Sequence, residues 1–167
     1  MKTKKPFAKF LSILLGAGSY ACLFLPFLLI STTTNVLNNT INNKEALSYQ
    51  NWVDLLEADS DKLWAWNTSN IVMILALTFI GVIVFISLIQ FFVKSKSLNN
   101  ISNFICIIEI LTSIVFVVFF IIGCVNQSST TEILGSTITI KNIPHFAPCV
   151  LFVGTLLSSI LARSSNK

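Results

Sequence analysis

Four long apolar segments alternate with polar stretches along the chain. They cover residues 10–30, 71–93, 101–125 and 145–162. A helix needs about 20 apolar residues to cross the roughly 30 Å hydrocarbon core of a bilayer. In hydrocarbon the backbone must satisfy its own hydrogen bonds, which favours helices. The pattern therefore predicts an all-α integral membrane protein, one membrane domain over residues 1–167, with four transmembrane helices in an antiparallel bundle. The first segment is longer than the apolar core of a signal peptide, about 7–15 residues, so we expect it to be a retained helix.

The polar stretch 31–70 predicts the first part of an extracytoplasmic cap. Residues 31–43 are rich in Ser, Thr and Asn and are expected to be irregular or briefly extended. Residues 44–58 have helical periodicity, and Asn42 followed by Glu45 resembles a helix N-cap. This predicts an amphipathic helix that lies on the outer surface or packs over the bundle. Its apolar face is formed by Tyr49, Trp52, Val53 and Leu56.

Two further features belong to the outer side. Trp64 and Trp66 precede the second apolar segment, and amphipathic indole rings suit the headgroup layer, so an aromatic belt is expected there; a ligand-binding aromatic cluster is the alternative. In the stretch 126–144, apolar and hydroxyl residues alternate over 133–140, and Gly135 with Ser136 can form a turn. This predicts a short β-hairpin, which would need support from the first loop because an isolated hairpin is marginal in water.

The charges are sorted between the connections, which predicts the orientation. Cytoplasmic loops are enriched in Lys and Arg, so both termini and the connection 94–100 are expected to be cytoplasmic, with 31–70 and 126–144 outside. The cytoplasmic group contains Lys2, Lys4, Lys5, Lys9, Lys94, Lys96, Arg163 and Lys167. The outer group contains the acids Glu45, Asp54, Glu57, Asp59, Asp61 and Glu132, with Lys44, Lys62 and Lys141.

Composition excludes several functional classes. Only 11% of the 167 residues are charged and 54% are hydrophobic, whereas soluble domains have about 25% charged residues. The net charge of +4 is explained by lysines beside the bilayer rather than by nucleic-acid binding. No C-x-x-C pair, phosphate-binding loop or H-E-x-x-H motif occurs, and His145 is the only histidine. We therefore expect no catalytic residues, no metal site and no cofactor.

One acid, Glu109, falls inside an apolar segment, where the hydrocarbon favours its neutral form. It shares one helix face with three small polar residues, and we expect this stripe to face the bundle interior. Its role is a hydrogen bond that fixes helix packing, a proton or cation relay, or a contact with a partner subunit. The candidate bonding partners on other helices are Ser12, Gly16, Ser19, Tyr20, Thr78, Ser87, Gln90, Ser158 and Ser159. The intramembrane polar stripe consists of Ser102, Cys106, Glu109 and Ser113.

Small residues recur at four-residue spacing in the first and last segments, for example Ser12 with Gly16 and Gly154 with Ser158. Such spacing favours close helix packing inside the bundle, or dimerisation. Cys124 and Cys149 lie near the outer ends of the last two segments and are buried thiols or a disulfide.

The developed outer cap favours an interaction, accessory or structural membrane protein over an enzyme. Its expected partners are the lipid bilayer and either another membrane protein or a second copy of the chain. A small proton- or cation-coupled transporter that uses Glu109 is the alternative. A single ionisable residue and the lack of a recognisable internal repeat count against that alternative.

Overall fold

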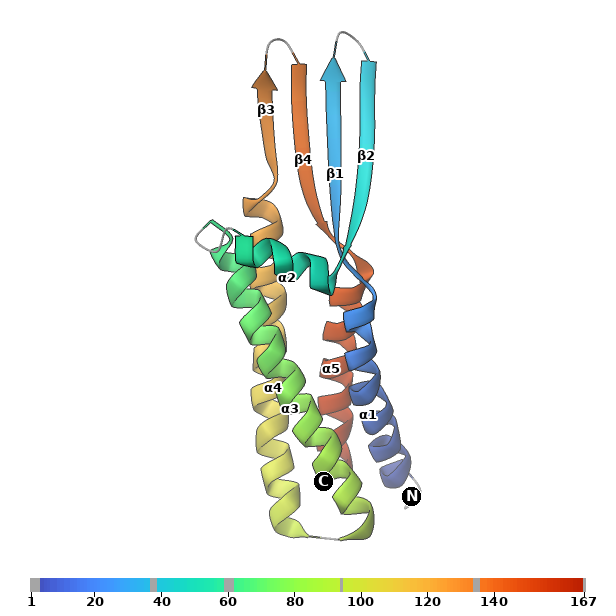
Figure 1. The fold of residues 1–167 in the computed structure, drawn as a ribbon. Coiled ribbons are helices and arrows are strands. Elements are labelled where there is room, and N and C mark those ends of the chain that lie inside the picture. The colour runs from blue at the N-terminus through green and yellow to red at the C-terminus, as the bar shows by residue number, and fades with distance from the viewer. Residues whose placement is uncertain (1–3, 37–38, 59–61, 94, 134–135, 167) are drawn as a thin grey trace.

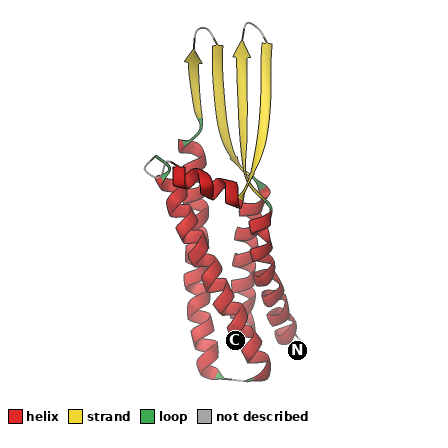
Figure 2. Ribbon diagram, viewed as in Figure 1, coloured by secondary structure: helices red, strands yellow, loops and turns green. Residues whose placement is uncertain are grey.

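The computed structural model describes residues 4–36, 39–58, 62–93, 95–133 and 136–166. This part of the chain is mostly helical and carries one small β-sheet (Figure 2). In chain order the elements are α1 (Lys4–Ala21), the short 3-10 helix η1 (Cys22–Phe24), β1 (Pro26–Val36), β2 (Asn39–Ser48), α2 (Tyr49–Ala58), α3 (Trp64–Phe92), α4 (Lys96–Asn126), β3 (Ser129–Ile133), β4 (Ser136–Pro144) and α5 (Phe146–Ser165).

Among the described residues, four helices are long and apolar enough to cross a membrane: α1 extended by η1, α3, α4 and α5. They run side by side, with both chain ends at the end remote from the sheet (Figure 1). The closest pairings are α3 with α4 and α1 with α5. Large apolar side chains on their outer surfaces are exposed, such as Phe85 on α3 and Phe104 on α4. Lipid solvates such side chains, so this surface fits a membrane environment.

The first apolar segment is not one helix, which corrects the prediction for residues 10–30. The helix ends at Ala21, η1 follows, and Leu25 is extended before Pro26 opens β1. A proline disfavours helical backbone in the residue before it and lacks the N–H that a helix needs. Beyond Pro26, Leu28 to Ile30 pair with β2 on one side and β4 on the other. The apolar run therefore continues from a helix into the centre of a sheet.

The part expected to lie outside is built mainly from β-strands, so the fold is mostly helical with a small sheet rather than all-α. Of the two states expected at 31–43, the extended one is found, over 31–36 and 39–43. The strand order is β2-β1-β4-β3, with every neighbouring pair antiparallel. The predicted hairpin is present as β3 and β4 and extends to Pro144; the turn expected at Gly135 lies outside the described residues. The support it needs comes from the first loop, because β4 pairs with β1 along eight registered positions.

The amphipathic helix is shorter than predicted. Residues 44–48 belong to β2, and α2 begins at Tyr49, where the Ser48 hydroxyl accepts a bond from the Asn51 amide. The cap predicted at Asn42 is therefore wrong, since Asn42 pairs with Thr33 in the sheet. Three other helices are longer than predicted. The helix α3 begins earlier, at Trp64, and α4 begins earlier, at Lys96, whereas α5 (Phe146–Ser165) ends later than expected.

Candidate functional site

A buried polar seam runs along α4 inside the helical part of the molecule. Ser102, Cys106, Glu109 and Ser113 are each 0% exposed. Glu109 and Ser113 face hydroxyl side chains of α5, where Thr155 and Ser159 are also fully buried. The residues between them on α4 include exposed apolar side chains such as Ile107 and Leu111. The helices thus enclose their polar groups and turn their apolar groups outward.

Glu109 is held at the centre of this seam by hydroxyl groups from two helices. Ser113 Oγ lies 2.6 Å from its Oε1, and Ser159 donates a hydrogen bond to its Oε2. Ser113 Oγ also lies 2.9 Å from Thr155 Oγ1, which lies 3.1 Å from the carbonyl oxygen of Phe152. Of the partners expected from the sequence, Ser159 is the one that bonds Glu109. Thr155 was missed, although its spacing from Ser159 on one helix face could have revealed it.

Hydroxyl groups of two helices satisfy both carboxyl oxygens of Glu109. Ser113 donates to Oε1 and Ser159 donates to Oε2. The next hydroxyl along, that of Thr155, donates to the carbonyl oxygen of Phe152. These contacts of Glu109 all come from uncharged groups. The chain of contacts ends on a backbone carbonyl, which accepts a hydrogen but has none to pass on.

Other small and polar residues bring α1 against its neighbours. Ser12 and Ser158 exchange hydroxyl-to-carbonyl bonds of 2.8 and 2.7 Å. Tyr20 donates to the Leu77 carbonyl at 2.5 Å, and its hydroxyl would be 2.6 Å from a Cβ at Gly81. These contacts allow the close backbone approach that small-residue spacing predicts inside a bundle. None of them engages Glu109, which corrects the expectation that α1 or α3 might bond it.

An aromatic cluster fills the junction between the helices and the sheet. Its members are Phe27, Tyr49, Trp52, Trp66, Phe116 and Phe120, whose neighbouring ring centroids lie 5.4–6.5 Å apart. Tilted and edge-to-face rings at this spacing are favourable. Trp52 and Phe27 are 0% exposed. The Tyr49 hydroxyl donates to Asn70 at 3.0 Å, and burial raises the pKa of this phenol, so it stays neutral. The cluster fixes the sheet to the helices.

The expected interfacial aromatic surface is thus largely an interior one. The apolar face of α2 packs over the helices, which was one of the two predicted placements: Trp52 and Leu56 are buried, and Tyr49 and Val53 are packed against the core. The belt prediction is wrong for Trp66, which is 4% exposed and lies against Gly123. Only Trp64 among these residues is exposed, and its ring contacts Phe119.

The two faces of the sheet differ in chemistry. Residues directly opposite each other on paired strands share a face, and successive residues alternate faces. The registers place six apolar residues on one face, which we call the isoleucine face, where they alternate with polar residues such as Thr32, Thr34 and Asn43. The other face, which we call the hydroxyl face, carries mainly hydroxyl and amide residues, with Leu29 and Ile143 near its base. The isoleucine face carries Ile30, Val36, Ile41, Ile133, Ile138 and Ile140. The hydroxyl face carries Thr33, Asn35, Thr40, Asn42, Thr130 and Thr139.

The hydroxyl face is bonded internally, and the isoleucine face is partly open. On the hydroxyl face Thr33 donates to Asn42 at 2.9 Å and Thr40 donates to Asn35 at 2.7 Å. On the isoleucine face Ile41 is 62% exposed and Ile133 is 52% exposed, whereas Ile138 is half-buried. No described helix covers the part of either face remote from the helices (Figure 1).

Charged residues lie on both faces of the sheet. At the sheet base, Leu28 and Leu47 of the isoleucine face are buried with Trp52, so α2 lies on that side. Glu45 belongs to the isoleucine face, and Asp54 and Glu57 are exposed on α2.

The hydroxyl face carries both signs of charge. Lys44 and Lys141 both pair with Ser31 and therefore share this face. Glu132 lies on the same face, because it pairs with Thr137. The described lysines of the sheet are thus on the hydroxyl face, while Glu45 is on the isoleucine face.

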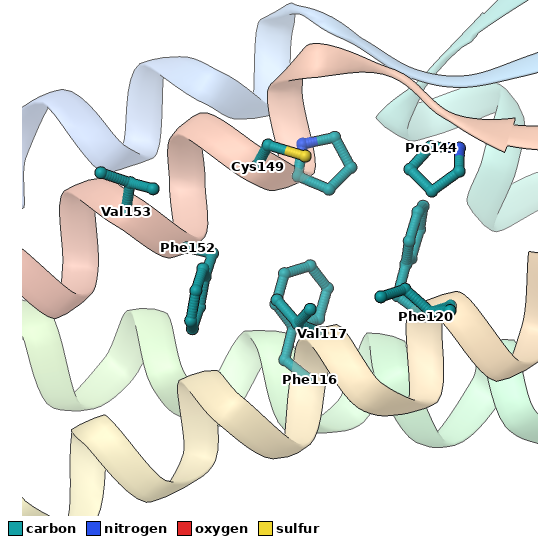
Figure 3. Close-up of a pocket in the computed structure, with 9 residues that line it drawn as sticks. Phe116, Val117, Phe120, Pro144, Cys149, Phe152 and Val153 are labelled. Carbon is teal, nitrogen blue, oxygen red and sulfur yellow. The ribbon is translucent and has the colours of Figure 1, made fainter.

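An apolar cavity of about 130 Å³ opens between α4 and α5 near the end of the helices that carries the sheet. Figure 3 shows Phe116, Phe120 and Phe152 around it, with Cys149 and Pro144 on its other side.

All four cysteines are free thiols, so Cys124 and Cys149 are not bridged. Within the part of the chain that the structure describes, no three His, Cys, Asp or Glu side chains gather as metal ligands.

Comparison of the chain with models of known protein families gives no match, and comparison with curated proteins gives none.

Proposed function

We propose that this protein is an accessory component of a membrane that presents its sheet to a partner protein. In this proposal the four long helices cross the bilayer as an antiparallel bundle. Both termini are cytoplasmic and the sheet stands outside, as the distribution of lysines and acids favours. The role is binding rather than catalysis. The observation that carries the proposal is the uncovered isoleucine face.

The composition of this face supports a binding role. Six β-branched apolar residues lie on one side of the sheet between hydroxyl and amide side chains, and protein interfaces commonly have such a mixed apolar and polar composition. From a strand spacing of about 4.8 Å and a rise of about 3.4 Å per residue, four strands of about nine residues present roughly 600 Å² of this mixed surface. Covering that area from both partners buries about 1,200 Å², the lower end of stable protein interfaces.

The charges beside the face identify the chemistry of the partner. Glu45 borders the isoleucine residues, and Asp54 and Glu57 are exposed on α2, which packs at the base of the sheet. We infer a partner segment with apolar side chains on one face and Lys or Arg beside them. Such a segment would cover the isoleucine residues and meet these acids, because complementary charge guides association and fixes register.

Photocrosslinking in the membranes of cells that express the full chain tests this proposal. A photoreactive phenylalanine analogue is placed at position 138, on the isoleucine face, or at its neighbour 139, on the hydroxyl face. We expect an adduct with one particular protein from 138 and at least about fivefold less from 139. The adduct peptide should contain apolar and basic residues. Asp54→Lys should reduce the yield at 138, whereas the matched change Lys44→Glu on the other face should not.

Several results would contradict the proposal. Equal yields from positions 138 and 139 would mean that the isoleucine face is not the docking surface. Adducts only with lipid would remove the protein partner, and adducts only with the chain itself would replace the accessory role by homo-oligomerisation. An acidic adduct peptide, or a yield unchanged by Asp54→Lys, would refute the inferred charge of the partner.

For Glu109 we propose a structural role rather than a transport role. The support is the closed hydrogen-bond chain from Glu109 to the carbonyl of Phe152, with Ser159 on the other carboxyl oxygen. A proton relay needs a group that can release a hydrogen at each end, and a carbonyl cannot. A buried polar network of this kind instead fixes how two helices pack.

A further inference from the structure

Both outer edges of the sheet are open. In the order β2-β1-β4-β3, the strands β2 and β3 stand at the two ends, and neither has a second neighbouring strand in the described part of the chain. Every residue at 39–46 of β2 and at 129–133 of β3 is exposed. An edge strand presents a row of unpaired backbone N–H and C=O groups, which is a template for a further strand. Each edge is therefore a surface that another strand can occupy.

The two edge strands run in opposite directions. The strands β1 and β3 lead away from the helices that precede them, and β2 and β4 return toward the helices that follow. All four stand along the long axis of the helices (Figure 1). Copies that cross one membrane in the same sense are related by rotation about the membrane normal, and such a neighbour places its β2 beside β3 as an antiparallel pair. Pairing of β2 with another β2 would instead turn one copy upside down.

The apolar side chains of the edges favour one register for this contact. Through the strands between them, Ser129 lies level with Asn43 of the same copy. An offset of two residues from that level keeps every side chain on its own face and sets Ile133 opposite Ile41 of the next copy. These are the two most exposed isoleucines of the described sheet, one on each edge. Opposed β-branched apolar residues stabilise paired strands.

The same register brings opposite charges together on the hydroxyl face. It sets Glu132 opposite Asn42 of the next copy, and therefore diagonal to Lys44. Diagonal neighbours on paired strands are about 7–8 Å apart, within reach of long side chains. A lysine on an edge strand commonly discourages pairing with other chains, but the edge that it meets in this register carries an acid. The two edges thus match in direction, in apolar contact and in charge.

We propose that β3 of one copy pairs with β2 of a second copy in the same membrane, so that the copies share one continuous antiparallel sheet. Each copy uses two different edges, so the contact forms a ring where the rotation closes. A four-stranded sheet is about 19 Å wide at about 4.8 Å per strand. Two helices side by side, each about 10 Å across, occupy a similar width, so the bundles fit beside each other.

The inference rests on the membrane crossing in the proposed function but not on the partner protein, because the contact uses the edges of the sheet and not its faces. Disulfide formation between full chains in cell membranes tests it. Within one copy, positions 41 and 133 are separated by three strand spacings, about 14 Å, whereas a disulfide needs Cα atoms within about 7 Å. A bond between these positions therefore joins two copies.

The expected product is a mixed dimer. Chains with Ile41→Cys and chains with Ile133→Cys carry different tags, are expressed together and are mildly oxidised. Both positions are exposed, so the fold should be retained. Ile41→Cys expressed alone should give no dimer above the background of the unaltered chain, in which Cys149 is exposed, because β2 does not meet β2 in one orientation.

Matched pairs of positions test the register. Thr40→Cys with Ile133→Cys sets the two thiols on opposite faces of the pleat and should give at least about fivefold less mixed dimer. Ile41→Cys with Thr131→Cys reports the register without an offset and should also give less than Ile41→Cys with Ile133→Cys.

Charge reversal tests the contact between Glu132 and Lys44. Glu132→Lys and Lys44→Glu should each lower the yield of the 41–133 dimer about threefold, through repulsion between diagonal neighbours. Chains that carry both reversals should recover the yield, which a merely structural role of either residue does not predict. Lys141→Glu, on the same face but in the central strand β4, is the matched control and should change nothing.

Contrary outcomes are equally defined. No mixed dimer from positions 41 and 133, or as much from 40 and 133, would overturn the edge contact. A product of position 41 with a different protein in place of the mixed dimer would show that another chain occupies the edge. More dimer from 131 than from 133 would overturn the offset, and no recovery in the double reversal would overturn the charge contact. None of these results bears on photocrosslinking at position 138, on a face of β4, so the two proposals fail separately.

Discussion

The helical part and the sheet are arranged in opposite ways. The helices bury Glu109, Ser113 and Ser159 and expose large apolar residues such as Phe85 and Phe104. The sheet bonds its Thr and Asn side chains on one outer face and exposes Ile41 and Ile133 on the other. The first arrangement suits hydrocarbon, where polar groups must find partners inside the protein. The arrangement of the sheet suits water only if its exposed isoleucine residues are few or are covered by a partner.

The difference shows which contacts hold each part together. Between helices, lipid removes most of the hydrophobic driving force, so close packing and hydroxyl bonds must stabilise the association. In the sheet, backbone ladders join the two outer loops, and hydrophobic burial is concentrated at the base in the aromatic cluster. Substitutions should therefore be most costly at the junction, less costly in the seam, and least costly on the outer sheet.

The largest effect is expected for Gly123→Ala at the junction. A Cβ at Gly123 would lie 1.9 Å from Trp66 Cδ1, so the indole would have to leave its buried position. Overpacking of this kind costs about 1–3 kcal/mol, occasionally more. Thermal unfolding in detergent micelles, followed by near-ultraviolet circular dichroism, measures the loss. Gly18→Ala on α1 is the control, since no atom lies within 4 Å of its Cβ position; equal melting temperatures for the two variants would contradict the packing described at Trp66.

A smaller loss is expected for Glu109→Leu in the seam. Leucine removes the shared partner of Ser113 and Ser159, but Ser113 keeps Thr155 and a serine hydroxyl on a helix can bond the carbonyl four residues earlier, so we expect a loss of about 1 kcal/mol. Glu109→Gln should be nearly neutral, because its amide can donate to Ser113 and its oxygen can accept from Ser159. The same unfolding assay compares the two variants. A glutamine variant as unstable as the leucine variant would contradict the stabilising role given to these hydrogen bonds.

The smallest effect is expected for Ile41→Thr on the isoleucine face. Ile41 is 62% exposed at an edge strand, and surface substitutions of this type change stability by less than about 0.5 kcal/mol. Leu28→Thr, in the same sheet but 0% exposed, should by contrast unfold the junction at a clearly lower temperature. If Ile41→Thr lowers the melting temperature as much as Leu28→Thr does, the isoleucine face is already covered and the contrast drawn here fails.

Much of the helical part could be predicted because apolar length is a local property. The four helices were recognised, but their ends were not, since polar residues such as Asn67 to Asn70 can continue a helix whose neighbours support it. Pro26 marked the true end of the first helix, yet the apolar residues beyond it concealed the change to a strand. The stripe of Ser102, Cys106, Glu109 and Ser113 followed from helical spacing alone. Its partner Thr155 required knowledge of which helix lies opposite.

The sequence by itself determined which segments can enter a membrane, where the lone acid lies, and that the outer loops are polar with a helix and a hairpin. These features depend on residues close together in the chain. The tertiary structure alone decided that β1 pairs with β4, that Trp66 rests on Gly123, and that Ile41 and Ile138 share one sheet face. The physical reason is that strand register and helix contacts join residues distant in sequence, and alternation within a single strand does not say which neighbour will share its face.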